Sequence, residues 1–114
     1  MTLSTSTVSG NNSPGGGGIA NLAGTLTLTN STVSGNIAGG LAGGITNFDS
    51  ATLTVVNSVI SDNEAEFGGG IVNEIGGVIV TARNSTISSN TAGQGGGGID
   101  NNGVLILTNT TVSA

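Results

Sequence analysis

Carboxylates are the only side chains of this sequence suited to acid–base catalysis, because it has no histidine, cysteine or tyrosine and a single basic residue, Arg83. Hydrolysis of a glycosidic bond requires two carboxyl groups, one on each side of the bond. The six acidic residues are Asp49, Asp62, Glu64, Glu66, Glu74 and Asp100. Their spacing brings no two of them to matching positions of the repeat described below. We therefore predict a non-catalytic protein without a cofactor, whose carboxylates form a solvated edge.

Metal and phosphate sites find little support in the sequence. Calcium takes about six to eight oxygen ligands, more than the cluster Asp62, Glu64 and Glu66 supplies. The stretch GGGGID at 95–100 occurs once, whereas a calcium-binding β-roll needs its aspartate in every short repeat. A phosphate loop leads into a helix and usually contains lysine, but here the glycines lead into a strand pattern. We predict neither kind of site.

The charge balance excludes several classes of partner. A net charge of -5 with one basic residue cannot neutralise the phosphates of nucleic acid or form a basic patch for anionic lipid. No run approaches the roughly 20 apolar residues of a spanning helix, so we predict no membrane insertion. The first residues do not resemble a signal peptide. The length indicates one domain, residues 1–114.

The composition indicates a folded chain with a narrow core. Hydrophobic residues make up 35% of the sequence and charged residues 6%, which separates it from disordered linkers despite its glycine content. The only aromatic residues are Phe48 and Phe67. A core without large aromatic side chains must be thin and aliphatic.

Three landmarks recur in a fixed order along the chain. An isoleucine after each glycine cluster precedes an asparagine by two positions, an alternating segment ends in asparagine, and an aliphatic residue precedes a third asparagine by three positions. The isoleucines are Ile19, Ile45, Ile71 and Ile99, at spacings of 26, 26 and 28 residues. Short segments rich in Thr, Val and Ile at this period predict strands rather than helices.

We predict an all-β fold, a right-handed parallel β-helix of about four coils with three strands per coil. Alternation turns aliphatic side chains inward in columns, for example Leu26 with Leu53 and Val33 with Ile60. The glycine clusters are expected to form turns with positive φ. Asparagines at strand ends tolerate left-handed backbone and can bond one another along a column. These corner residues are Asn11, Asn21, Asn30, Asn36, Asn47, Asn57, Asn63, Asn73, Asn84, Asn90, Asn101 and Asn109.

The pairing of GGGI with an aliphatic-x-x-Asn element resembles the repeat of the chlamydial polymorphic membrane proteins. That family carries Gly-Gly-Ala-aliphatic and Phe-x-x-Asn tetrapeptides in β-helical autotransporter passengers, whereas Val or Ile replaces Phe here. The repeats are also similar to those of large right-handed β-helix surface proteins of environmental bacteria. The resemblance implies an extracellular or cell-surface structural role. It carries no catalytic residue over to this chain.

The two ends of the sequence suggest a partner. Residues 1–10 align with residues 105–114, and all seven charged side chains lie between Asp49 and Asp100. Solenoid ends are normally capped and exposed strand edges are normally blunted by charge, so we predict head-to-tail association of the protein with itself. The predicted end residues are Leu3, Val8, Leu105, Leu107 and Val112. The protein would be a filament subunit or a segment of a surface adhesin; alternatively, the stretch belongs to a longer solenoid.

Two other functions remain as hypotheses. One is ice binding by outward columns of threonine (Thr7, Thr32, Thr86 and Thr111, interrupted by Val59) and of serine (Ser9, Ser34, Ser61, Ser88 and Ser113). The simpler explanation of these columns is that threonine is a good residue for an exposed strand. The other is a carbohydrate-binding or degenerate enzyme module, which the scarcity of aromatic residues disfavours.

Overall fold

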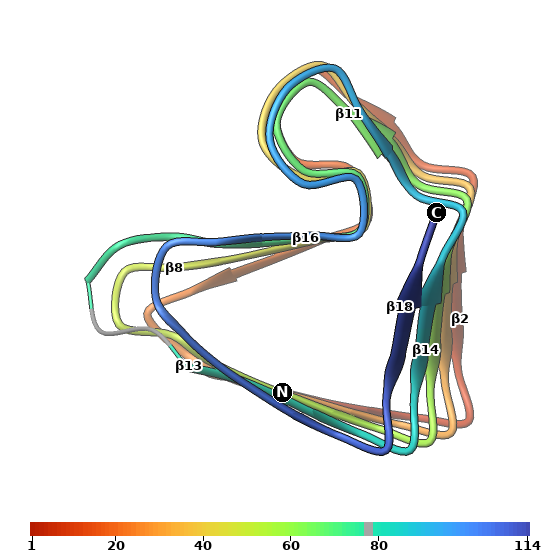
Figure 1. Cartoon of the computed structure of the whole chain (residues 1–114), viewed down its shortest axis with the longest axis vertical. Coiled ribbons are helices and arrows are strands. Elements are labelled where there is room, and N and C mark those ends of the chain that lie inside the picture. Colours follow the sequence, from red (N-terminus) through yellow and green to blue (C-terminus); the bar gives the residue numbers. More distant parts are fainter. Residues whose placement is uncertain (77–78) are drawn as a thin grey trace.

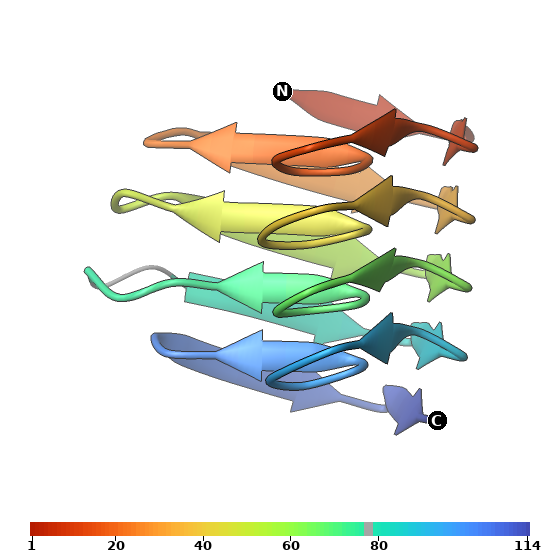
Figure 2. The same cartoon turned by 90° about the horizontal axis from the view of Figure 1, so that it is seen from above.

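The computed structural model describes residues 1–76 and 79–114. They form a parallel β-solenoid of about four coils with about 26 residues per turn. Figure 1 looks down the tube from the C-terminal end, and the chain winds counterclockwise towards the viewer, so the solenoid is right-handed. Figure 2 shows the coils stacked with the two termini at opposite ends. The described residues contain no helix, and hence none that could cross a membrane.

The strands form four sheets, which we name A to D in the order in which the chain visits them. Sheet A consists of β1 (Thr2–Ser4), β5 (Thr25–Thr29), β9 (Thr52–Val56), β13 (Ile79–Arg83) and β17 (Val104–Thr108). Sheet B consists of β2 (Thr7–Ser9), β6 (Thr32–Ser34), β10 (Val59–Ser61), β14 (Thr86–Ser88) and β18 (Thr111–Ser113). Sheet C consists of β3 (Asn12–Ser13), β7 (Ile37–Ala38), β11 (Glu64–Ala65) and β15 (Thr91–Ala92). Sheet D consists of β4 (Ile19–Leu22), β8 (Ile45–Phe48), β12 (Ile71–Asn73) and β16 (Ile99–Asn101).

Neighbouring coils align residue by residue, so that like side chains stack inside the tube. Leu26 lies beside Leu53 in sheet A, and Val33 lies beside Ile60 in sheet B. All four are fully buried and belong to one cluster that contains only Ile, Leu, Val and Ala among its buried members. The inward columns and the thin aliphatic core predicted from alternation are therefore confirmed.

Sheet C is a fourth face of the tube, in addition to the three strands expected per coil. Its strands are only two residues long, and the glycine-rich chain that follows each of them folds back as a hook outside sheet D (Figure 1). Thr46 and Val72 point outward from sheet D, yet they are buried because the hook covers them. A Cβ on Gly16 would lie 3.4 Å from Thr46 Oγ1, which places the hook backbone directly against sheet D. The two inner coils thus pack on both sides of sheet D, whereas Ala20 in β4 is exposed.

The expected role of the glycine clusters is mostly wrong. Among the described glycines of the clusters, only Gly95 has a positive φ. The reason for glycine is instead the close approach of neighbouring coils. At Gly44 a Cβ would collide with the carbonyl oxygen of Gly70 and would lie 3.2 Å from Ile60 Cγ2. The clusters allow coils to stack at strand spacing where a side chain would hold them apart.

The connections from sheet D to sheet A differ in length from coil to coil. They comprise residues 23–24, 49–51, 74–78 and 102–103, where 77–78 lie outside the described residues. The strands on either side nevertheless keep their register, for example Leu22 beside Phe48 and Thr25 beside Thr52. This corner absorbs part of the variation in repeat length without disturbing the sheets, and the hooks, residues 14–18, 39–44, 66–70 and 93–98, also differ by one residue.

Candidate functional site

A ladder of asparagine side chains runs along the tube between sheets B and C. The backbone N–H and the Nδ2 of Asn36 both donate to Oδ1 of Asn63, at 3.0 and 2.9 Å. Asn11 and Asn63 make the same pair of bonds to the next coil. The Nδ2 of Asn63 also donates to the carbonyl oxygen of Val33. Because Asn36, Asn63 and Asn90 are buried, these bonds satisfy polar groups that water cannot reach.

A second ladder follows the ends of the strands of sheet D. Nδ2 of Asn21, Asn47 and Asn73 each donates to Oδ1 of the asparagine in the next coil, at 2.7–3.0 Å. Nδ2 of Asn47 also donates to the carbonyl oxygen of Ala51. Because Ala51 is the last residue before β9, this bond spans the connection of residues 49–51 and ties β8 to the start of β9.

A third asparagine column has a different role. Asn30, Asn57, Asn84 and Asn109 lie at the corner between sheets A and B, where all four are exposed and have φ between 46 and 50°. Asparagine tolerates this left-handed backbone. The internal bonding at this corner comes from serine, since the N–H of Ser31 donates to Ser58 Oγ and the N–H of Ser58 to Ser85 Oγ. Sequence reasoning missed this serine column, although a serine follows the asparagine in three repeats.

The acidic residues lie apart from any enclosed space. In the stretches 1–76 and 79–114 no pocket opens, and no three Asp or Glu side chains gather to hold a metal ion. Glu66 accepts a hydrogen bond from Gln94 Nε2 at 2.7 Å in the hook. That the protein is not an enzyme remains a prediction.

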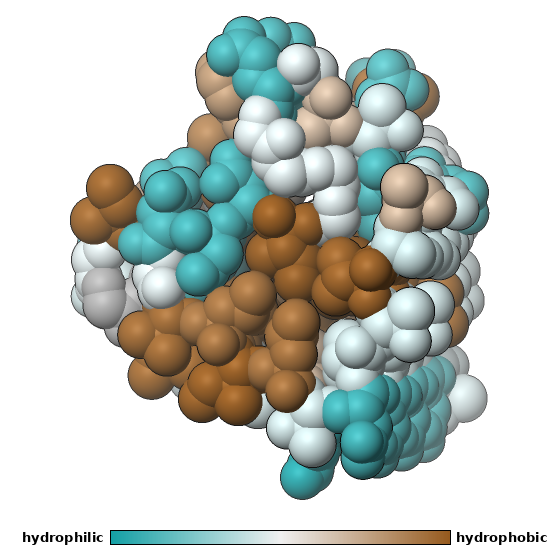
Figure 3. Space-filling model, viewed as in Figure 1, coloured by the Kyte–Doolittle hydropathy of each residue, from teal (hydrophilic) through white to brown (hydrophobic). Residues whose placement is uncertain are grey.

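At the ends of the tube the inward-facing side chains are no longer fully buried. Leu28, Val55 and Ala82 are fully buried, but Leu107 in the same column is 41% exposed. In sheet B, Val112 is 43% exposed, whereas Ile87 beside it is fully buried. At the other end Leu3 and Val8 are half-buried against the core. Figure 3, which faces the C-terminal end, shows apolar side chains gathered across it.

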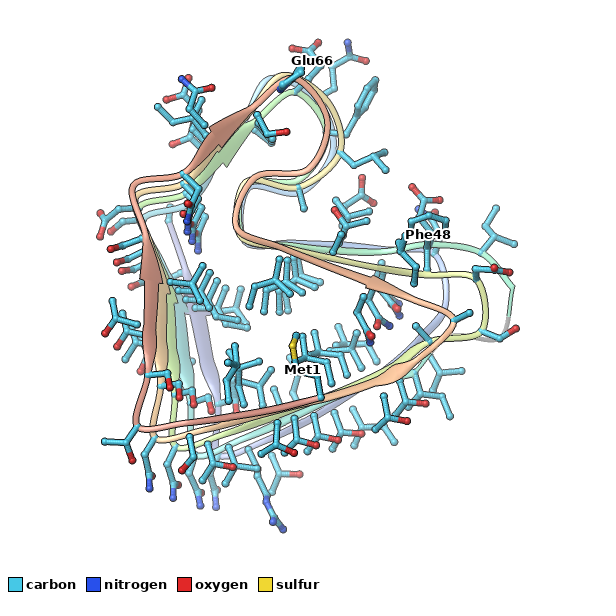
Figure 4. The ribbon with its side chains drawn as sticks, turned by 180° about the vertical axis from the view of Figure 1, so that it is seen from behind. Met1, Phe48 and Glu66 are labelled. Carbon is cyan, nitrogen blue, oxygen red and sulfur yellow. The ribbon has the colours of Figure 1, made fainter. Side chains whose placement is uncertain are left out.

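Figure 4 shows the tube from its N-terminal end, with the side chains drawn. In Figure 4 the side chains stand in rows along the tube, and Met1 lies at the near end over the interior, while Phe48 and Glu66 lie outside it. Met1 is 69% exposed. The two end faces are thus the places where interior side chains meet solvent.

Comparison with protein-family models, curated proteins and solved structures finds no match. The assignment of the fold as a parallel β-solenoid therefore rests on the arrangement of the strands in the structure. The likeness of the repeat to chlamydial proteins remains a resemblance of motifs.

Proposed function

We propose that this protein is a non-catalytic structural β-solenoid that associates with itself end to end. The protein would act outside the cell or at its surface, as a filament subunit or as a segment of an adhesin, in line with the resemblance of its repeat to those of bacterial surface proteins. The observation that carries the proposal is the exposed apolar interior at the C-terminal end, represented by Leu107 and Val112.

The end faces favour addition of a further coil on two grounds. Strand edges at both ends present unpaired backbone groups, which are templates for another strand. The strands at the N-terminal edge carry no charged side chain, and those at the C-terminal edge carry one, Asp100 in β16. A coil that added there would bury the open columns as the inner coils are buried. Heterologous contact of this kind is open-ended and gives fibres.

Leu107→Lys should suppress assembly. Lysine at this inward position would place a charge in the junction and remove an apolar side chain, whose burial contributes roughly 1.5–3 kcal/mol. We expect the concentration needed for assembly to rise about tenfold or more. Sedimentation velocity over a concentration series, with electron microscopy of the same samples, measures this.

Thr108→Lys is the matched control, because Thr108 is the exposed next residue of β17 and its side chain points away from the interior. It adds the same charge to the same strand and should leave assembly close to that of the unmodified protein. A monodisperse monomer at high concentration, unaffected by either substitution, would refute end-to-end association.

A second candidate function is ice binding by the outer face of sheet B. Thr7 pairs with Thr32, and Thr86 with Thr111, so hydroxyl groups lie at strand spacing in both pairs. Val59 interrupts the column between them. If this face binds ice, Thr32→Lys or Thr86→Lys should abolish thermal hysteresis while circular dichroism stays unchanged. Thr91→Lys, on sheet C, is the control that should keep it. Absence of hysteresis in the unmodified protein would eliminate this function.

A further inference from the structure

The two ends of the tube do not meet as complementary flat faces. Sheets A and B have five strands, whereas sheets C and D have four. If a second copy placed its β1 on β17 and its β2 on β18, sheets C and D would each lack one strand at the junction. The edges of β15 and β16 would then be enclosed without backbone partners, which is costly. Simple stacking therefore makes a poor junction.

Residues 1–10 and 105–114 occupy equivalent places in the repeat. The register of sheet A puts Leu3 and Leu107 in one column, four coils apart. The register of sheet B does the same for Val8 and Val112. Residues 7–9 and 111–113 both read Thr-Val-Ser. Either segment can therefore line the same part of a coil with side chains of the same kind.

The asparagine ladders give the two ends opposite hydrogen-bonding character. Along the B–C ladder each asparagine donates towards the C-terminal end through its N–H and Nδ2. Within the described residues Asn90 has no further asparagine to receive these bonds, and the Oδ1 of Asn11 receives none. The D ladder has the same direction, with Asn21 as its first donor and Asn101 as its last acceptor. Donors at one end match acceptors at the other.

We propose that copies of this chain join by strand replacement, in which residues 105–114 of one copy take the place that residues 1–10 hold in the next. This deepens the proposed end-to-end association and rests on it. β3 of the second copy pairs with β15, β4 with β16, β5 with β17 and β6 with β18, so all four sheets continue across the junction. Asn90 donates to Oδ1 of the second copy's Asn11, as Asn63 donates to Asn90.

The segment that must leave is held along one side only. β1 and β2 pair only with β5 and β6. The N–H groups of Thr5, Ser6 and Gly10 donate to Thr29 O, Ser31 Oγ and Ser34 O. Equivalent bonds form again with residues 105–114, so the exchange leaves sheets A and B unchanged in pairing and adds a pair each to sheets C and D. Gly10 is exposed at the corner where the displaced segment departs.

A disulfide that locks β2 to β6 tests the mechanism. Thr7 and Thr32 are register partners on the outer face, and the chain has no cysteine of its own. Strand partners about 4.8 Å apart lie within the range of Cα separations that a disulfide spans. In the variant with Thr7→Cys and Thr32→Cys, oxidation should raise the concentration for assembly at least about tenfold, and a reductant should restore assembly.

The control is a lock in the middle of the tube, Val59→Cys with Thr86→Cys, which joins register partners of β10 and β14. Its oxidation should leave assembly unchanged. Equal assembly of the oxidised and reduced Thr7–Thr32 variant would overturn strand replacement while end-to-end association stands. No assembly of the unmodified protein and of both reduced variants would instead overturn the proposed function itself.

Hydrogen exchange of the unmodified protein is a second test of strand replacement. On assembly by strand replacement, the protection factors of the amides of Thr5, Ser6 and Gly10 should fall at least about tenfold. The reason is that residues of the other copy now bond the acceptors of these amides in the next coil. Unchanged or increased protection at these three amides in assembled material would contradict the proposal.

Discussion

Asn63→Ala should destabilise the solenoid by about 4 kcal/mol, because each buried polar group left unpaired costs about 1–3 kcal/mol. The substitution removes the acceptor of the Asn36 N–H and the donor to Val33 O, while Asn90 Oδ1 keeps only its bond from the Asn63 backbone N–H. All of these groups lie beside a side chain that is 1% exposed, so water does not replace the lost partners. The loss approaches the whole stability of an ordinary domain. Denaturant unfolding followed by circular dichroism measures it.

Asn57→Gly is the matched control in the exposed column. Asn57 has φ 48° and an exposed side chain. Glycine accepts that backbone without strain, so the free energy of unfolding should change by less than about 0.5 kcal/mol. If Asn57→Gly were as damaging as Asn63→Ala, the distinction between buried ladder and exposed corner would be wrong.

Gly44→Ala should be the second most damaging substitution, by about 3 kcal/mol, at the upper end of the cost of overpacking. The added methyl group collides with the carbonyl oxygen of Gly70 and lies 3.1 Å from Asn63 Nδ2. Both obstacles belong to the neighbouring coil, and the backbone cannot retreat without parting strands that pair on either side. The fall in the urea midpoint of unfolding measures the effect.

Gly15→Ala separates crowding from the general effect of replacing glycine. No atom lies within 4 Å of a Cβ at Gly15, and its φ is not in the left-handed region. The change should therefore be neutral within about 0.5 kcal/mol. A large loss at Gly15, or tolerance at Gly44, would show that coil spacing does not explain the glycine clusters.

Periodicity was sufficient to predict the solenoid because the inward positions repeat with the same chemistry in every coil. Leu26 and Leu53 each stand between two threonines in strands long enough to show a period of two. The strands of sheet C are two residues long, too short for alternation to be visible. The hook was missed for a related reason, since glycine and alanine carry no polarity pattern that tells an outer layer from a turn.

The asparagine positions were predictable, but their different roles were not. Asn57 and Asn63 look alike in the repeat, and only the backbone separates them, with φ 48° at an exposed corner for the first and a buried hydrogen-bonded amide for the second. The mismatch between five and four strands could be counted in the sequence. Its consequence for joining copies needed the register and the direction of the ladders.

The corner between sheets D and A has a practical consequence. Its connections of residues 23–24, 49–51 and 102–103 differ in length while the adjoining strands stay in register. Asp49 and Ser50, for example, are exposed, and exposed loop positions of this kind are where inserted sequence is tolerated. A peptide grafted there in each coil would be presented as a row of copies at intervals of about 4.8 Å, which makes the tube a scaffold for densely spaced display.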